Sequence, residues 1–257
     1  MQSFLEKIYD YYNNISFCST DPILFPHKLN GNKEYVAFLS SLFAYGRVKS
    51  INQFLNNLFN EYGTEPSNIT IKKNLYYRFQ TNDDIFNFLK FLKNIYDEFG
   101  SLYNYFLILD SSDVEKAYYL FRKDFLETFK NNTSHGLQFL LPDIYKSSAK
   151  RIRMFFRWMI RKDSIDFGIW KKYDKKLLKA PLDIHILTYA YNMNIIKNKS
   201  NNFKNVLNVT NYFLKVNNYD PLKYDFAITR LGMLEGCKFR KKESCKKCRW
   251  FNGCVFN

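Results

Sequence analysis

The order of apolar and polar residues along the chain has the period of an α-helix. In the segment 34–45, EYVAFLSSLFAY, apolar side chains recur every three or four positions, and the segments 51–63 and 82–100 repeat this spacing. The last two segments each end on a glycine, a residue at which helices commonly stop. We therefore predict an all-α fold, in which Asn82 or an adjacent aspartate caps the start of the third helix.

The segment 147–162, SSAKRIRMFFRWMIRK, has the most regular helical pattern in the chain. Its apolar residues fall on one side of a helix, which we expect to be buried. Ser147 or Ser148 is placed to cap the start of this helix. We expect the opposite side to contact anions; the alternative is an ordinary amphipathic helix with a solvated charged side. That side carries Lys150, Arg153, Arg157 and Arg161.

Composition adds positive charge to this helical chain of 257 residues. Lys and Arg number 39 against 24 Asp and Glu, which leaves a net charge of +15, and the chain also holds 26 Phe and 20 Tyr. This combination suits a nucleic-acid partner, although an A/T-rich genome would produce a similar bias. Because no run of 18 or more apolar residues occurs, we expect a soluble, cytoplasmic, nucleoid-associated monomer with no membrane partner.

Four of the five cysteines lie close together at the C-terminal end of the chain, with the spacing C-x7-C-x2-C-x5-C. Four thiolates this close in sequence suit one inorganic centre. A [4Fe-4S] cluster fits the single CxxC pair better than zinc, which more often uses two such pairs. Basic residues, among them Lys242 and Arg249, surround these cysteines and suit a phosphate backbone. Cys18 stands apart and is expected to be a packed thiol. The proposed ligands are Cys237, Cys245, Cys248 and Cys254.

The cysteine spacing resembles the C-terminal cluster motif of endonuclease III-type DNA glycosylases, C-x6-C-x2-C-x5-C, with one residue more in the first interval. Upstream, the segment PLDIH resembles the VDTH element that carries the catalytic aspartate of helix-hairpin-helix DNA glycosylases. Asp183 takes the place of that aspartate, and the interval from Asp183 to Cys237 is close to that of endonuclease III. Taken without the resemblance, Asp183 at the start of a helical pattern indicates an N-cap.

The same resemblance implies a catalytic lysine at the beginning of the helix that precedes the aspartate. Lys150 takes this place, and the interval from Lys150 to Asp183 is comparable to that of the archaeal 8-oxoguanine glycosylases. The helix dipole and the neighbouring cations would favour its free amine. A solvated or phosphate-contacting lysine is the alternative. The segment 140–150, LLPDIYKSSAK, would be the hairpin, without its usual glycine.

The resemblance implies a DNA base-excision glycosylase with β-elimination lyase activity on double-stranded DNA. Asp183 would stabilise positive charge on the sugar, and Lys150 would attack the anomeric carbon to form a Schiff base. The extruded base would stack on aromatic side chains, for which Tyr45, Phe156 and Trp158 are the candidates. The expected DNA contacts are Tyr45, Arg47, Lys146, Ser147, Ser148, Arg151, Arg153, His185, Lys242 and Arg249.

The fold implied by the resemblance has two lobes. Residues 33–160 would form the DNA-binding lobe, and residues 1–32 and 161–257 a discontinuous lobe that carries the cluster. Longer phrases, including DPILFPHKLN and DPLKYDFAITRLGM, resemble a bacterial family known only as a domain of unknown function. Two further functions stay open: an iron–sulfur DNA-binding protein without catalysis, and an electron carrier or redox sensor built on the same cysteines.

Overall fold

The predicted all-α class is confirmed. The computed structural model describes residues 1–131 and 134–256, and within them it contains twelve α-helices, four short 3-10 helices and no β-strand. None of the helices in these two ranges is both long enough and apolar enough to cross a membrane. The α-helices are α1 (Gln2–Tyr12), α2 (Leu24–Lys28), α3 (Lys33–Leu42), α4 (Val48–Tyr62), α5 (Asn82–Phe99), α6 (Leu102–Leu109), α7 (Val114–Thr128), α8 (His135–Leu140), α9 (Lys150–Ile160), α10 (Ile184–Asn192), α11 (Phe203–Val216) and α12 (Asp225–Leu234). The 3-10 helices are Ile15–Cys18, Pro66–Asn68, Lys175–Leu177 and Glu243–Lys247.

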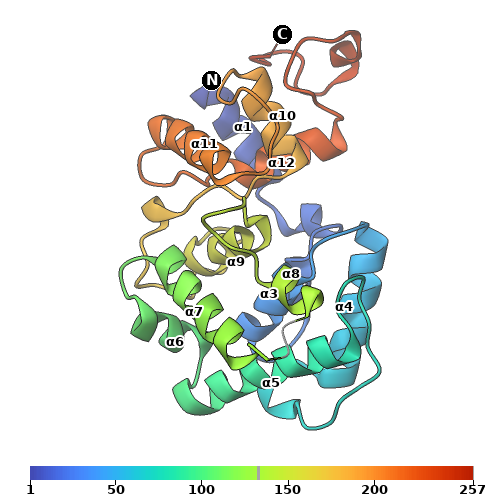
Figure 1. Ribbon diagram of the computed structural model, residues 1–257. Helices are drawn as coiled ribbons and strands as arrows, with labels where there is room; N and C mark the ends of the chain where they lie inside the picture. Colours follow the sequence, from blue (N-terminus) through green and yellow to red (C-terminus); the bar gives the residue numbers. More distant parts are fainter. Residues whose placement is uncertain (132–133, 257) are drawn as a thin grey trace.

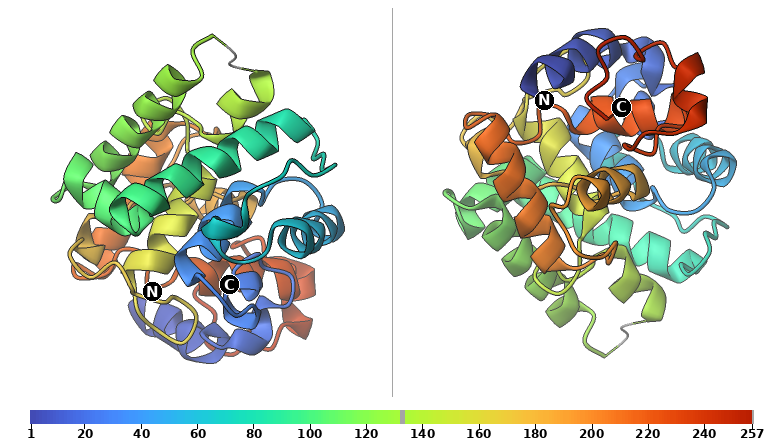
Figure 2. Two further views of the ribbon diagram at one scale, coloured as in Figure 1. Left: turned by 90° about the horizontal axis from the view of Figure 1, so that it is seen from below. Right: turned by 90° about the horizontal axis from the view of Figure 1, so that it is seen from above.

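The α-helices lie in two groups, with α9 between them (Figure 1). One group contains α1, α10, α11, α12 and the C-terminal segment, and the other contains α3 to α8. Both chain termini lie in the first group (Figure 1), and in the view from above α1 and the C-terminal segment lie side by side (Figure 2). α1 packs against α12, and α3 packs against α9. A single apolar core, from Phe4 to Phe256, runs through both groups, so the division into lobes at residues 33 and 160 stays a prediction.

Local signals set the ends of α4 and α5. Gly63 and Gly100 end these helices with φ angles of 73° and 75°, as the pattern predicts. The predicted cap at Asn82 is wrong by one residue. Thr81 is the N-cap of α5, because its hydroxyl accepts a hydrogen bond from the backbone N of Asp84 and the Asp84 carboxylate accepts one from the Thr81 backbone N.

The start of α9 is also different from the prediction. Ala149 precedes the helix in a left-handed conformation, with φ 37°, and neither Ser147 nor Ser148 caps it. The contacts of Asp143 explain why neither serine caps α9, because they organise the residues before the helix into a turn. The Asp143 carbonyl accepts hydrogen bonds from the backbone N and the hydroxyl of Ser147, so this hydroxyl faces the turn. α9 therefore begins at Lys150, without a side-chain cap.

The prediction of a basic side of α9 open to anions is wrong, because the arginines of this side are buried. The Arg153 side chain is 0% exposed and pairs with Glu115 at 2.7 Å. It also donates to the carbonyl of Ile144 at 2.9 Å. Arg151, which follows the first residue of α9, is buried too and donates to the carbonyls of Leu42 and Phe139. Contacts inside the protein therefore occupy both side chains.

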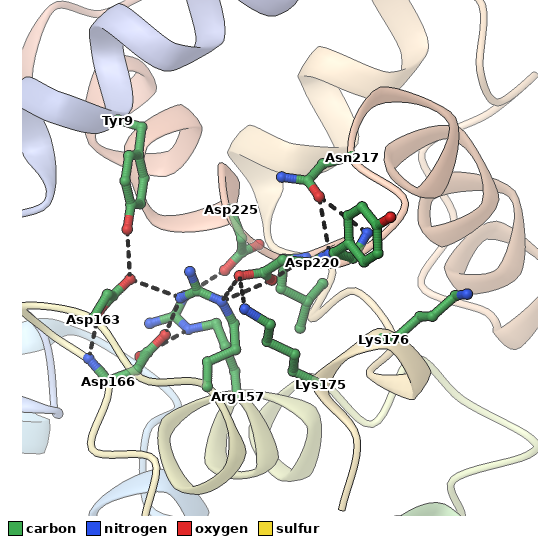
Figure 3. Close-up of polar contacts among 12 residues, drawn as sticks. Tyr9, Arg157, Asp163, Asp166, Lys175, Lys176, Asn217, Asp220 and Asp225 are labelled. Atoms are coloured by element: carbon green, nitrogen blue, oxygen red, sulfur yellow. Dashed lines mark hydrogen bonds and ion pairs between the residues drawn. The ribbon is translucent and has the colours of Figure 1, made fainter.

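The other two arginines of this side join a network of buried aspartates (Figure 3). Arg157 binds Asp166 at 3.3 Å and also pairs with Asp225 of α12. Arg161 binds Asp220 at 2.9 Å, and it pairs with Asp166 as well. Asp166 is therefore shared by two arginines, and its side chain is only 1% exposed. This network attaches α9 to the segments that precede and contain α12.

Replacing Asp166 with asparagine removes the shared carboxylate and leaves two buried arginines short of a partner. The free energy of unfolding is expected to fall by about 3–5 kcal/mol. Urea denaturation followed by circular dichroism measures the change. Asp97→Asn is the control, because Asp97 forms a surface pair with Lys93 and its loss costs less than about 1 kcal/mol. Equal losses in the two variants would contradict the role given to the buried network.

Candidate functional site

A cavity of about 420 Å³ lies between α9, α12, the N-terminal end of α10 and the turn after α3. Lys150, Asp183 and Tyr45, which the sequence proposed for a single site, all line this cavity. Met154 and Phe226 add apolar surface to its wall. Its other charged side chains are Asp21, Arg151, Arg157, Asp225 and Arg230. The cavity therefore brings three carboxyl groups together with four basic groups.

Asp183 is the N-cap of α10, as its position in the sequence indicates. Its Oδ1 accepts hydrogen bonds from the backbone N of His185 and of Ile186, both at 2.8 Å. Its Oδ2 accepts a hydrogen bond from Thr229 Oγ1 of α12 at 2.9 Å. Three donors from two helices therefore hold this carboxylate in one orientation at the cavity wall.

Lys150 is the first residue of α9 and is half-buried at the cavity. Two of the cations expected to crowd it are already paired. Arg153 binds Glu115, and Lys146 lies 3.9 Å from Asp143. Of the three expected cations, Arg151 is the one that lines the cavity together with Lys150, which also lies at the positive end of the α9 dipole.

Tyr45 follows α3 and lies half-buried between two arginines. Arg151 lies over its ring at 4.8 Å from the centroid, and Arg78 lies over it at 5.7 Å. Burial raises the pKa of the Tyr45 hydroxyl. Of the three aromatic candidates for stacking on a base, Tyr45 is thus the one that lines the cavity. The predictions for Phe156 and Trp158 are wrong, because both side chains are at most 1% exposed in the core.

The remaining predicted DNA contacts differ in exposure. Four cations are exposed: Arg47, Lys146, Lys242 and Arg249. Ser147 is half-buried, whereas Ser148, Arg151 and Arg153 are buried, so their predicted contact with a phosphate is not supported by this arrangement. His185 is half-buried against Gly232 of α12, where an added Cβ would lie 2.3 Å from its Nδ1. Burial lowers the pKa of His185, which favours its neutral form.

The four C-terminal cysteines line a second, smaller pocket of about 30 Å³. Cys237 Sγ accepts a hydrogen bond from the backbone N of Phe239 at 3.3 Å. Burial raises the pKa of Cys237 to about 11, and the nearby thiols of Cys254, Cys248 and Cys245 add to this effect. In residues 1–131 and 134–256, no three His, Cys, Asp or Glu side chains are already arranged as a metal-ligand set. Cys18 is buried elsewhere, as expected.

Sequence reasoning missed the contribution of α12 to the cavity. Asp225, Phe226, Thr229, Arg230 and Met233 all line it. A signal was available, because these positions recur at intervals of three and four residues and therefore form one stripe on a helix. Polar residues inside an otherwise apolar helical pattern can mark such a stripe.

The protein is all-helical, and one cavity holds both a lysine and the carboxylate that caps α10. Residues 21–234 match the family described as "Protein of unknown function (DUF2400)", and the chain belongs to this family. No curated protein and no solved structure matches the chain. The family match includes Lys150 and Asp183 and stops before Cys237. All the residues that line the cavity except Thr20 lie in the family region, and the cysteine pocket follows that region.

Proposed function

We propose that the protein is a DNA base-excision glycosylase whose cavity receives a nucleotide extruded from double-stranded DNA. One observation carries this proposal: Lys150 and Asp183, which are distant in the chain, line the same cavity. The cavity volume of about 420 Å³ falls in the range of small-molecule sites. Tyr45, Met154 and Phe226 offer aromatic and apolar surface against which a base would pack.

Asp183 and Lys150 have separate tasks in this function. The Asp183 carboxylate, fixed by its three donors, stabilises the positive charge that grows on the sugar as the bond between C1′ and the base breaks. The electron pair of that bond leaves with the base. The amine of Lys150 attacks C1′, and the resulting Schiff base leads to strand cleavage by β-elimination.

Exposed cations supply the attraction to the DNA backbone. Arg47 follows Tyr45 closely in the chain and precedes α4, and Lys146 lies in the turn before α9. Lys242 and Arg249 belong to the cysteine-bearing segment. With a net charge of +15, the protein favours a polyanionic partner, and the affinity should fall steeply as salt rises.

The residues of the second pocket fit a [4Fe-4S] cluster, with zinc as the alternative. Four thiols line one pocket, and Lys238, Arg240 and Lys242, which also line it, would balance the negative charge that four thiolates bring to a metal centre. The ligands would be Cys237, Cys245, Cys248 and Cys254. The cluster would supply a covalent link that orders the C-terminal segment.

Asp183→Asn is expected to slow base release by about 100-fold or more, because the amide cannot stabilise the cationic sugar. A panel of duplex oligonucleotides, each with one oxidised, deaminated or alkylated base, is scored for base release by the parent and the variant. Affinity for the same duplexes should stay close to that of the parent. Release at the parental rate would refute the role of Asp183. Salt-sensitive binding by the parent without release of any base would favour the non-catalytic DNA-binding alternative.

Borohydride trapping on a duplex with one abasic site tests Lys150. The parent should form a covalent adduct, and Lys150→Ala should form none, because the attacking amine is gone. Lys162→Ala is the matched control, since Lys162 is exposed just after α9 and does not line the cavity. An adduct in Lys150→Ala would assign the amine elsewhere. No adduct in the parent would remove the lyase activity and leave base release by water.

Metal analysis tests the cysteine pocket. The parent, purified without oxygen, should be brown and contain about four iron atoms per chain. Cys248→Ser should lose most of this iron, because one ligand is missing. Cys18→Ala is the control and should retain it, since Cys18 lies in the core away from the pocket. Stoichiometric zinc in a colourless protein would replace the cluster with the zinc alternative.

A further inference from the structure

Asp225 is a buried carboxyl group in the cavity to which the proposed reaction assigns no task. It lies at the first position of α12, and only 4% of its surface is exposed. Its Oδ2 pairs with Arg157. Its Oδ1 is buried and has no hydrogen-bond partner among the residues that the structure describes. A buried oxygen without a partner is costly, so this one calls for an explanation.

Charged groups near Asp225 come from several elements. Arg157 belongs to α9, Asp166 to the segment after α9, and Asp183 to the start of α10. Arg230 belongs to α12 itself and pairs with Asp21 of the segment before α2, which also lines the cavity. Burial raises the pKa of Asp225 to about 6, Arg157 opposes this rise, and Asp183 and Asp166 add to it. The carboxyl therefore changes its protonation state near pH 6.

Asp183 and Asp225 differ in the way they are held. Both oxygens of Asp183 accept hydrogen bonds, three in all, so its carboxylate is held in one orientation. Asp225 has one oxygen paired with Arg157 and one that accepts no hydrogen bond from residues 1–131 or 134–256. Two acids in one cavity with different surroundings are suited to different tasks.

We propose that Asp225 is the proton-exchanging group of this cavity, and that it gives one proton and takes one during strand cleavage at an abasic site. This inference rests on the proposed function, since it uses Lys150 as the attacking amine. It adds a catalytic group on α12, which comes later in the chain than α10, the helix that Asp183 caps.

The protons and electrons of this sequence balance. The amine of Lys150 adds to the aldehyde carbon C1′, and a proton moves from nitrogen to the former aldehyde oxygen. Protonated Asp225 gives its proton to this hydroxyl, which leaves as water while the nitrogen lone pair forms the C=N bond. The Asp225 carboxylate then takes a proton from C2′. The electron pair of that C–H bond forms the C2′=C3′ bond, the C3′–O bond breaks, and the 3′-phosphate leaves with its electrons.

The test compares Asp225→Asn with Asp220→Asn on a duplex that carries one abasic site. Asp220 is the matched control, because it is a buried, arginine-paired aspartate that does not line the cavity. Borohydride-trapped adduct and strand nicking are measured in single turnovers from about pH 5 to about pH 8. At about pH 6, Asp225→Asn should slow both steps by about 100-fold or more relative to Asp220→Asn.

The pH dependence adds a readout that lost packing would not change. Since only the protonated carboxyl gives a proton, the ratio of adduct-forming rates, parent to Asp225→Asn, should fall as pH rises through about 6. Asp220→Asn should keep the pH profile of the parent, and Asp225→Glu should recover part of the lost rate.

Three outcomes would overturn the inference. If Asp225→Asn matches Asp220→Asn in rate and pH profile, Asp225 exchanges no proton, although the lyase activity itself stands. If the parent forms no adduct and makes no nick, the proposed lyase function fails and this role fails with it. If circular dichroism shows that Asp225→Asn does not fold, the pH profile of the parent protein is the test. Parent rates of adduct formation and nicking that do not change near pH 6 would then overturn the role of Asp225.

Discussion

The burial of the α9 arginines is the constraint on which the rest of the structure depends. A guanidinium removed from water is costly unless acids or carbonyls surround it. Glu115 of α7 meets Arg153, whereas Asp220 and Asp225, which lie just before and at the start of α12, meet Arg161 and Arg157. Since α9 lies between the two groups of helices, these pairs connect both groups to one helix (Figure 1). Ion pairing, added to a continuous apolar core, thus positions the helices relative to one another.

The same helix also forms one side of the cavity, so the geometry of the cavity depends on this network. Lys150 lies at the beginning of α9, and Arg157 lines the cavity two turns later while it holds Asp225. On the opposite side, Thr229 of α12 holds the carboxylate of Asp183. α12 therefore touches both acids, one through Thr229 and one as its own first residue. A change in the distance between α9 and α12 would move the amine relative to both carboxyl groups.

Short sequence patterns predicted several helix ends correctly, although the starts of α5 and α9 differ from the prediction, and they failed for the side of α9 that distant residues cover. Asp183 capping α10 and Gly100 ending α5 depend on backbone groups within a few positions, so short patterns were enough. The burial of the basic side of α9 could not be predicted in this way. Helical periodicity identifies which side a residue lies on, not what covers that side. The partners of Arg153 and Arg157, Glu115 and Asp225, lie 38 and 68 residues away in the chain. For Arg153, nothing close in the chain distinguishes a buried arginine from a DNA-binding one, whereas Asp166, nine residues after Arg157, was a local signal for the burial of Arg157.

The position of the cysteine segment explains how a metal centre outside the family region would serve a cavity inside it. α12 lines the cavity and leads directly to Cys237, whose backbone N donates to the carbonyl of Leu231 at 3.4 Å. Glu235, just after α12, pairs with Arg249 at 2.9 Å and accepts a hydrogen bond from Tyr12 of α1 at 3.2 Å. A cluster on the four thiols would close the loop between these contacts. In the proposed function the effect of the cluster would therefore be mechanical, because the cluster would hold the C-terminal end of α12, the helix that carries Asp225 and Thr229.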